Sequence, residues 1–572
     1  MRKITGIPAS TGIAIGKAFV YTKSSNLKKE LLKFQNISPE KSIILFREAV
    51  KKAIEHLNNI IRRTEEEIGT DEAGIFDAQI LMLEDEDFQG AVIELLEKEF
   101  PLDKAIWDVT DFYVKKFSEI ENVYFKERAS DIRDIGNHII NALIGKQTSL
   151  LADLRNKVIV VSKELTPSDT AEMCKDKVIG FATEVGGSTS HVAIIARALN
   201  IPAVVGSSKL MQLVNPETPL IVDGVKGEII INPDPETITS YQNMREKIKE
   251  DQDKLKKFAK MKAITLDGYK IEIQANIGSL DGINLALENG ADGIGLLRTE
   301  FLYLGRETLP TEEESYTTIK KILLSMDNRP VILRTLDIGG DKNIPSLNLP
   351  AEANPFLGYR GSRFITDPEL RNIIFTQIRA ALRASIYGKL RIMFPMVTTL
   401  SEIKTLRMMV EKAKNLVLNE NYSIAESIEI GIMVEVPSAA ICADILAPYV
   451  DFFSIGTNDL TQYTLASDRT NEMVANLYDQ YHPSVLRLIQ QVVQAAHNHG
   501  KWVGVCGELA GDPLATPLLI GLGIDELSMN PAAILRIKKG ISEISHSECQ
   551  KIIKQVLSFG ESSEIRSFLE NL

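Results

Sequence analysis

One histidine stands in a context that suits nucleophilic chemistry. His191 follows the segment GGSTS at 186–190 and precedes an apolar run. The glycines permit a tight turn with close backbone approach, and Thr189 or Ser190 can cap a helix that begins there. Free N–H groups and the positive dipole end favour an anion in the first turn of such a helix. His191 could therefore take and carry a phosphoryl group; the alternative is a histidine that merely caps the helix.

Arginines recur where predicted strands of the C-terminal half end. Four of them fall at strand ends or in the loops that follow: Arg298, Arg334, Arg360 and Arg469. Several arginines that converge on one site suit a small ligand with both phosphate and carboxylate groups. The alternative interpretation is ordinary ion pairing on the surface.

Two carboxylates and a thiol occupy similar positions. Glu435 and Asp459 come from adjacent predicted strands. They could hold one Mg²⁺, whose other ligands would be substrate oxygens and water. Cys506 ends the next strand, where a thiol could give a proton to a carbanion. These residues predict a metal-assisted site for an anionic small molecule, with Cys506 as its acid.

Eight short apolar segments must position these side chains, and they alternate with longer helical stretches. They lie at 270–276, 292–297, 330–335, 391–395, 430–435, 451–455, 502–506 and 525–529. Eight β/α units over roughly 300 residues fit a TIM barrel, whose active sites form at the C-terminal ends of the strands. The alternative is a doubly wound open sheet.

The N-terminal half combines two kinds of pattern. Residues 1–22 and 147–233 alternate like strands and predict an α/β domain that carries His191. Residues 23–146 show helical period and predict an inserted helical bundle, whose first helix begins at Ser38-Pro39. Residues 234–262 are charge-dense and predict a solvated linker helix. The barrel domain then covers 263–572.

Composition limits the possible functions. A chain of 572 residues suggests three or four folding units at about 150 residues each. The net charge of -12 argues against a general nucleic-acid or anionic-membrane binder and allows a basic protein partner. The four cysteines form no CxxC pair, which argues against a zinc site or a disulfide framework. No apolar stretch of about 18 residues predicts a membrane span, and we expect a cytoplasmic protein.

Several long motifs carry a resemblance to a known family. They are GGSTSHVAIIAR at 186–197, LLRTEFLYL at 296–304, LRTLDIGGDK at 333–342, NPFLGYRGSR at 354–363, DFFSIGTNDLTQYTLASDR at 451–469 and CGELAGD at 506–512. Together they resemble the Enzyme I family of the bacterial sugar phosphotransferase system, the phosphoenolpyruvate–protein phosphotransferases. The resemblance covers essentially the whole chain, from ITGIPASTGIAIG at 4–16 to the end of the barrel.

The resemblance implies a role for each residue that matches a family motif. His191 would take the phosphoryl group of phosphoenolpyruvate and pass it to a histidine of a small histidine-containing phosphocarrier protein. Glu435 and Asp459 would be the Mg²⁺ ligands, and Cys506 would protonate the enolate to pyruvate. Thr170 and Thr189 would support the active histidine. The substrate would be bound by Arg298, Arg334, Arg360, Asn458, Asp459 and Arg469.

The resemblance also implies partners. The helical insert would dock the phosphocarrier and the barrel would form a homodimer, with a hinge at 234–262. Acidic runs at 65–67 and 84–87 suit docking to a basic protein, with Leu83 as a further apolar contact; the alternative is a solvated helix surface. The docking candidates are Glu67, Met82, Glu84 and Asp85.

Four other classes of protein can be weighed against this one. Pyruvate phosphate dikinase and phosphoenolpyruvate synthase share the swivelling histidine domain and the barrel, but they need a large ATP-binding domain that this length leaves no room for. The sequence also has no GxxxxGK[ST] stretch. A nitrogen-regulatory paralogue would carry an extra N-terminal sensory domain. A signalling scaffold without sustained turnover would have lost catalytic side chains, and none of those named is missing.

Overall fold

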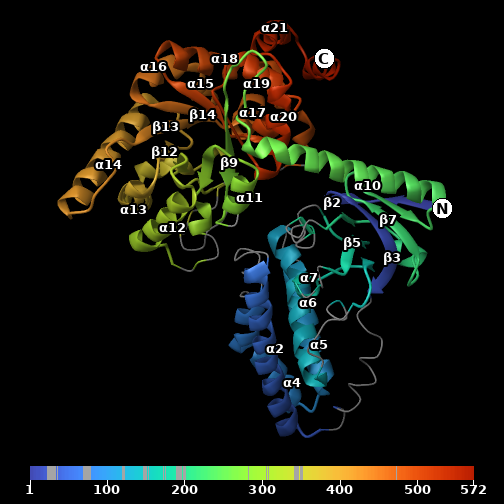
Figure 1. Ribbon diagram of the computed structural model, residues 1–572. Helices are drawn as coiled ribbons and strands as arrows, with labels where there is room; N and C mark the ends of the chain where they lie inside the picture. The colour runs from blue at the N-terminus through green and yellow to red at the C-terminus, as the bar shows by residue number, and fades with distance from the viewer. Residues whose placement is uncertain are drawn as a thin grey trace. The chain divides into compact units, whose positions relative to one another are not determined.

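Two structural units make up the chain, residues 1–250 and 251–572, and each is described by itself (Figure 1). The computed structural model describes residues 1–21, 34, 37–67, 76, 79–118, 123–145, 151, 154–171, 173, 176–187, 193, 196–197, 201–280, 282–303, 306, 308–339, 347, 349, 352–469, 471 and 473–572. Within these ranges no helix has the length and apolar character needed to cross a membrane.

A mixed eight-stranded sheet forms one part of the first unit. Its strand order is β1-β8-β7-β3-β4-β5-β6-β2. The run from β3 to β6 is parallel and the other pairings are antiparallel. The strands are β1 (Arg2–Thr5), β2 (Ile7–Ser10), β3 (Ile13–Tyr21), β4 (Val158–Ser162), β5 (Val178–Thr183), β6 (Ala203–Val205), β7 (Pro219–Asp223) and β8 (Glu228–Ile231). All five residues of β4 are buried, as expected of a central strand.

Helices form the other part of the first unit. They are α2 (Pro39–Glu67), α4 (Glu86–Glu97), α5 (Leu102–Ser118) and α6 (Val123–Ile144). The prediction that the first helix begins at Ser38-Pro39 is confirmed. Phe46 and Leu57 of α2, Phe88 of α4 and Ile106 of α5 meet in one hydrophobic core, together with Leu83 before α4.

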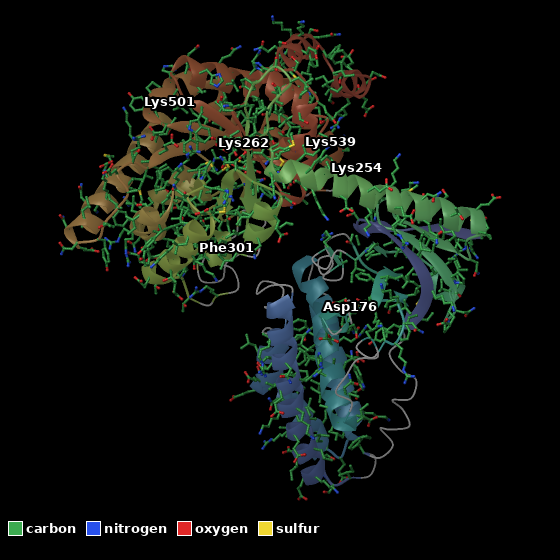
Figure 2. The ribbon with its side chains drawn as sticks, in the orientation of Figure 1. Asp176, Lys254, Lys262, Phe301, Lys501 and Lys539 are labelled. Atoms are coloured by element: carbon green, nitrogen blue, oxygen red, sulfur yellow. The ribbon has the colours of Figure 1, made fainter. Side chains whose placement is uncertain are left out.

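The helix α10 (Pro235–Lys256) follows the sheet and packs on it. Its side chains at helical spacing, Ile238, Tyr241, Met244 and Ile248, contact the sheet residues Ile13, Ile221 and Ile230. Charged residues elsewhere on it, such as Lys254, are exposed (Figure 2). The prediction of a solvated helix is therefore wrong for one face of α10, because a narrow apolar stripe was hidden among its charges.

The second unit is a closed barrel of eight parallel strands, which confirms the predicted TIM barrel and excludes the open sheet. Its strands are β9 (Glu272–Ile277), β10 (Gly293–Arg298), β11 (Val331–Arg334), β12 (Leu390–Phe394), β13 (Glu429–Val434), β14 (Phe452–Ile455), β15 (Trp502–Val505) and β16 (Glu526–Met529). Each overlaps one predicted segment.

Helices cover the outside of the barrel (Figure 1). They include α11 (Gly282–Glu288), α12 (Glu312–Ser325), α13 (Pro368–Ala384), α14 (Leu400–Asn419), α15 (Pro437–Ile441), α16 (Ala443–Leu446), α17 (Thr457–Leu465), α18 (Pro483–Asn498), α19 (Thr516–Leu522), α20 (Ile534–Ser542), α21 (His546–Val556) and α22 (Ser562–Glu570). Capping boxes at Thr311 and Thr399 fix the starts of α12 and α14.

Candidate active site

The carboxyl ends of the barrel strands bring most of the predicted site residues together. Arg298 and Arg334 are the last residues of β10 and β11, and Glu435 and Cys506 directly follow β13 and β15. A cavity of about 250 Å³ opens between them. The predicted residues that line it are Arg298, Arg334, Arg360, Glu435, Asn458, Asp459, Arg469 and Cys506.

Two of the arginines are already neutralised by acidic residues inside the protein. The Arg334 guanidinium lies 2.5 Å from Glu300 Oε1 and 3.0 Å from Asp337 Oδ2. Arg360 donates from Nε and Nη2 to the two oxygens of Asp337, at 3.1 and 2.8 Å. All four side chains are buried, so these pairs form a rigid, hydrogen-bonded floor below the cavity.

Asp459 is held from two sides. Its Oδ2 lies 2.9 Å from Nη2 of Arg360, and its Oδ1 accepts a 2.7 Å hydrogen bond from Nη1 of Arg469. The neighbouring Asn458 forms two hydrogen bonds with Glu508. Its Nδ2 donates to the Glu508 carboxylate, and its Oδ1 accepts from the Glu508 backbone N–H. The first turn of α17 is thereby fixed to the loop after β15.

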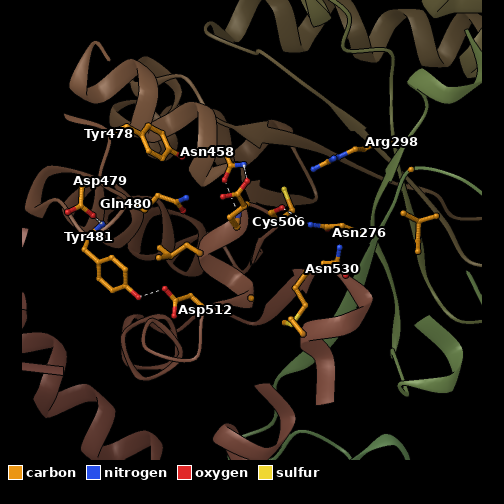
Figure 3. A pocket seen from close by; sticks show the side chains of 18 of the residues that line it. Asn276, Arg298, Asn458, Tyr478, Asp479, Gln480, Tyr481, Cys506, Asp512 and Asn530 are labelled. Atoms are coloured by element: carbon orange, nitrogen blue, oxygen red, sulfur yellow. Dashed lines mark hydrogen bonds between the residues drawn. The ribbon is translucent and has the colours of Figure 1, made fainter. Parts of the chain in front are cut away.

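Arg298 differs from the other arginines. It makes no hydrogen bond or ion pair with any residue that the structure describes. Arg298 keeps exposed surface at the mouth of the barrel, but partial desolvation there, and next the positive charge of Arg334, lower the pKa of its guanidinium below the ordinary value. Figure 3 shows its side chain pointing toward the space beside Cys506. A free arginine charge at this point favours binding of an anion.

Glu435 combines deep burial with acidic neighbours. Its Oε1 accepts a 2.6 Å hydrogen bond from the Met396 backbone N–H. Burial first, and then the charges of Asp337 and Asp459, raise the pKa of Glu435 to about 8. A cation placed among these carboxylates would remove that repulsion, so Glu435 and Asp459 suit a metal whose other ligands are not protein groups. The described part of the chain offers no cluster of three or more acidic, histidine or cysteine ligands.

Cys506 is buried at the base of the cavity. Its thiol points to the carbonyl oxygen of Ile455 at 3.7 Å. Burial raises the pKa of Cys506 to about 12, so the group is a protonated thiol at neutral pH. A second cavity of about 740 Å³ adjoins it and shares Arg298, Asn458 and Cys506 as lining residues (Figure 3).

The sequence analysis missed Asn276, which lies near the end of β9. It donates from Nδ2 to the Cys506 carbonyl at 3.0 Å and accepts from the Ser528 hydroxyl at 2.6 Å. Asn276 lines the larger cavity and points into it (Figure 3). Asn276 ends the predicted strand 270–276, so the argument from strand ends that identified Arg298 would also have identified it. The sequence analysis also missed Tyr463. Its hydroxyl donates to the Phe356 carbonyl at 2.5 Å and lies 3.2 Å from Nη1 of Arg360. Because Tyr463 lies on a helix, its position relative to the strand ends gave no indication of this role.

The predicted histidine site is only partly visible. His191 and Thr189 lie outside the described residues. Thr170 is buried in α7 (Pro167–Ala171), and its hydroxyl donates to the Thr166 carbonyl at 3.2 Å. Asp169 beside it accepts a 2.6 Å hydrogen bond from the Tyr21 hydroxyl. The segment with Thr170 is therefore fastened to the end of β3.

The predicted docking residues differ in exposure and in structural role. Glu84 and Asp85 are both exposed, and Asp85 also caps α4 by accepting from the Phe88 N–H at 2.8 Å. Met82 is partly buried against the helical core. Leu83 is fully buried there, so its prediction as a partner contact is wrong; Leu81, 62% exposed, presents the apolar surface instead. Glu67 ends α2, and its side chain lies outside the described set.

Comparison with protein families matches three models along the chain. They are the N-terminal domain of PEP-utilising enzymes at 5–128, the mobile domain of PEP-utilising enzymes at 154–227, and the PEP-binding domain of PEP-utilising enzymes at 252–546. The third covers the residues of the barrel cavity described above.

Curated relatives align over the full length. A phosphoenolpyruvate-protein phosphotransferase of Bacillus sp. (strain S) is 44% identical over 570 residues, which is 100% of this chain and 98% of the relative. The protein of that name from Geobacillus stearothermophilus has the same identity and coverage. The one from Staphylococcus carnosus (strain TM300) is 43% identical over 574 residues, with 100% and 99% covered.

Proposed function

This chain belongs to the phosphoenolpyruvate-protein phosphotransferase family, and we propose that it transfers the phosphoryl group of phosphoenolpyruvate first to His191 and then to a histidine of a small phosphocarrier protein. The observation that carries this proposal is Arg298, which has no ion-pair partner among the described residues, beside the buried thiol of Cys506 in one cavity. An arginine that can bind an anion, next to a thiol that can donate a proton, suits a substrate that becomes an enolate as its phosphoryl group leaves.

The arginines act on the substrate by position and charge. Phosphoenolpyruvate carries a phosphate and a carboxylate, and both suit guanidinium donors. Arg298 supplies the free charge. Arg334 and Arg360, which are held by acidic partners, present fixed N–H groups to the cavity. Arg469 and Asn458 complete the wall toward α17. Phosphoryl transfer depends mainly on such positioning and charge stabilisation.

Mg²⁺ fits this site as a cofactor. Glu435 and Asp459 would hold it, together with substrate oxygens and water. When bound, the metal would neutralise charge on the phosphoryl and enolate oxygens. Burial, and next repulsion by Asp337 and Asp459, raise the pKa of Glu435, and the repulsion supports the assignment because a cation would relieve it.

Cys506 then supplies the proton that completes the reaction. As the P–O bond breaks, a P–N bond forms to the imidazole of His191, and the enolate of pyruvate remains. The Cys506 S–H bond breaks as a C–H bond forms at the methylene carbon, which gives pyruvate. A thiol with a raised pKa stays protonated until that moment. Thr170 and Thr189 would orient His191.

The remaining assignments concern the parts of the chain. Residues 1–22 and 147–233 would form the phosphohistidine domain, residues 23–146 the subdomain that docks the phosphocarrier, and 234–262 the linker and hinge. The docking face would use Glu67, Met82, Glu84 and Asp85. The barrel, 263–572, would form a cytoplasmic homodimer; exposed apolar side chains on it, such as Met408 and Ile441, support an interface.

Labelled phosphoenolpyruvate tests the proposal directly. With Mg²⁺ present, the protein should acquire acid-labile, base-stable label and release pyruvate. His191→Ala should abolish the label, whereas His497→Ala, at an exposed histidine on α18, should retain it. Label that persists in His191→Ala would overturn the assignment of the acceptor, and absence of label in the wild-type protein would overturn the function.

A further inference from the structure

A carboxyl group lies in the centre of the barrel, below the site described above. Ser454, Gly504 and Glu526 are register partners on the neighbouring strands β14, β15 and β16. Gly504 has no side chain, and Oε2 of Glu526 stands where a Cβ on Gly504 would lie. Likewise, Oε1 of Glu526 lies where a Cβ on Gly295 would meet it. Two glycines thus make room for one acidic side chain in the barrel interior.

This carboxyl group is buried and unpaired. Glu526 is 1% exposed, and neither of its oxygens has a hydrogen-bond partner among the described residues. An isolated carboxylate is costly in such surroundings. Burial, and to a smaller extent the charge of Glu272, therefore raise the pKa of Glu526 well above its ordinary value, while Arg391 lowers it. The neutral, protonated form of Glu526 is therefore favoured.

Cys506 lies on the same strand as Gly504, whose side-chain space Glu526 fills. It is two residues beyond Gly504, so both occupy the inward face, with Cys506 nearer the mouth. Cys506 packs among the side chains of the barrel interior, which include Met433 and Phe452. The hydroxyl of Ser454 is buried near the Cys506 thiol and makes no hydrogen bond of standard geometry within the described chain. Ser454 and Glu526 are the register partners of Gly504 on its two sides.

The other end of this row reaches solvent. Glu526 is the register partner of Glu272, the first residue of β9, and Glu272 is exposed. Gln274 donates to Oε2 of Glu272 at 2.8 Å, and its own Oε1 is buried with no hydrogen-bond partner in the described part of the chain. Polar groups therefore continue from the N-terminal end of the barrel to the base of the substrate cavity.

We propose that Glu526 is a proton-relay residue that returns a proton to Cys506 after each turnover, with Glu272 as its connection to solvent. The inference rests on the proposed function, in which Cys506 gives its proton to the enolate. The O–H bond of Glu526 breaks and the S–H bond of Cys506 forms again, directly or through the Ser454 hydroxyl, which accepts one proton as it donates another. The Glu526 carboxylate then takes a proton from water at the Glu272 end.

Two physical facts favour this direction of transfer. The thiolate of Cys506, whose parent thiol has a pKa of about 12, is a strong base toward a neutral carboxylic acid. The route from below also stays open while pyruvate still fills the cavity above. Glu526 does not touch the substrate in this scheme and acts only through Cys506.

Counting turnovers separates a relay from a structural role. Glu526→Gln keeps the shape of the side chain but removes the acidic proton. The first equivalent of pyruvate, formed by rapid mixing with phosphoenolpyruvate, Mg²⁺ and a phosphocarrier protein, should appear within about twofold of the wild-type rate. Later turnovers should slow by about tenfold or more. Equal slowing of the first and later turnovers, or no change in either, would overturn the proposal.

Two further variants keep the test decisive. Glu272→Gln changes an exposed residue and should also slow only the later turnovers, even if Glu526→Gln does not fold. In a Cys506→Ala background, adding Glu526→Gln should cause no further loss, because the relay then has no receiver. A further loss in that background would contradict the relay. Failure of the wild-type protein to form pyruvate at all would instead contradict the proposed function.

Discussion

Asp459 and Arg360 form a buried ion pair at the mouth of the barrel, with Oδ2 and Nη2 2.9 Å apart. The same carboxylate is bound by Arg469, so both of its oxygens are occupied in the protein alone. A metal ion at Asp459 would compete with the two arginines for this carboxylate and release their N–H groups toward a substrate. Metal binding and substrate binding are therefore linked through one side chain.

Removing the charge of Asp459 should break this linkage. In the wild-type protein, Mg²⁺ should strengthen the binding of phosphoenolpyruvate, and in Asp459→Asn that gain should fall about tenfold. Calorimetric titration with and without Mg²⁺ measures it. Asp337→Asn is the matched control, because Asp337 also holds Arg360 but is not a proposed ligand. It should weaken binding similarly with and without the metal, and an identical response of the two variants would contradict the linkage.

The affinity for Mg²⁺ should depend on pH through Glu435. The pKa of about 8 exceeds the ordinary value of 4.5, so below pH 8 the folded protein holds a proton that the metal must displace. We expect the apparent affinity to fall by up to about tenfold for each pH unit below that point, measured by titration between about pH 6.5 and 8.5. Glu435→Gln should bind the metal weakly throughout and lose this pH dependence. A wild-type affinity that is flat across the range would contradict the prediction.

The barrel and its strand-end residues could be predicted because their signals are local. Short apolar runs separated by helical stretches identify parallel strands, and the residues after them must meet at one end. Which of the arginines pair with acidic side chains could not be predicted in this way. Arg298 and Arg334 look alike in the sequence, and each has an acidic residue within three positions, but Arg334 is paired both with its neighbour Asp337 and with Glu300, which comes from the end of the adjacent strand.

Two other features did not stand out in the sequence. Asp85 reads as one acid in an acidic run, but its carboxylate is used as a helix cap. The stripe of Ile238 and Tyr241 on α10 is too sparse to stand out among charges until the sheet beneath it is seen. The cap is a local contact between residues three apart, whereas the stripe depends on contact with strands that are distant in sequence.

The Cys506 thiol should react slowly with alkylating reagents and yet be necessary for pyruvate formation. Because burial raises its pKa to about 12, its thiolate fraction stays small up to about pH 9. Iodoacetamide should therefore modify the partly exposed Cys442 well before Cys506, as peptide mass spectrometry would show. Cys506→Ala should slow pyruvate formation by about 10²-fold or more with little change in substrate binding. The rate of pyruvate formation in Cys506→Ser should lie between those of the wild-type protein and Cys506→Ala, since a hydroxyl is a weaker acid than a thiol. Unchanged turnover in Cys506→Ala would show that Cys506 is not the acid.

Charge reversal before and within α4 tests the docking face. Glu84 and Asp87 are exposed, and Asp85 between them must be kept, because loss of its cap would cost about 1 kcal/mol of stability. Glu84→Lys with Asp87→Lys should slow transfer to the phosphocarrier by about tenfold and spare labelling of the protein by phosphoenolpyruvate, because the barrel cavity is unchanged. The slowing should shrink as salt is added.

The matched control lies at the far end of the same helix. Glu97→Lys also reverses an exposed charge on α4, and it should leave both reactions at their wild-type rates. Comparable slowing by Glu97→Lys would mean that net charge, and not this face, governs association with the carrier. Slowing of self-labelling in the Glu84 and Asp87 variant would place its defect in the chemistry and contradict a docking role.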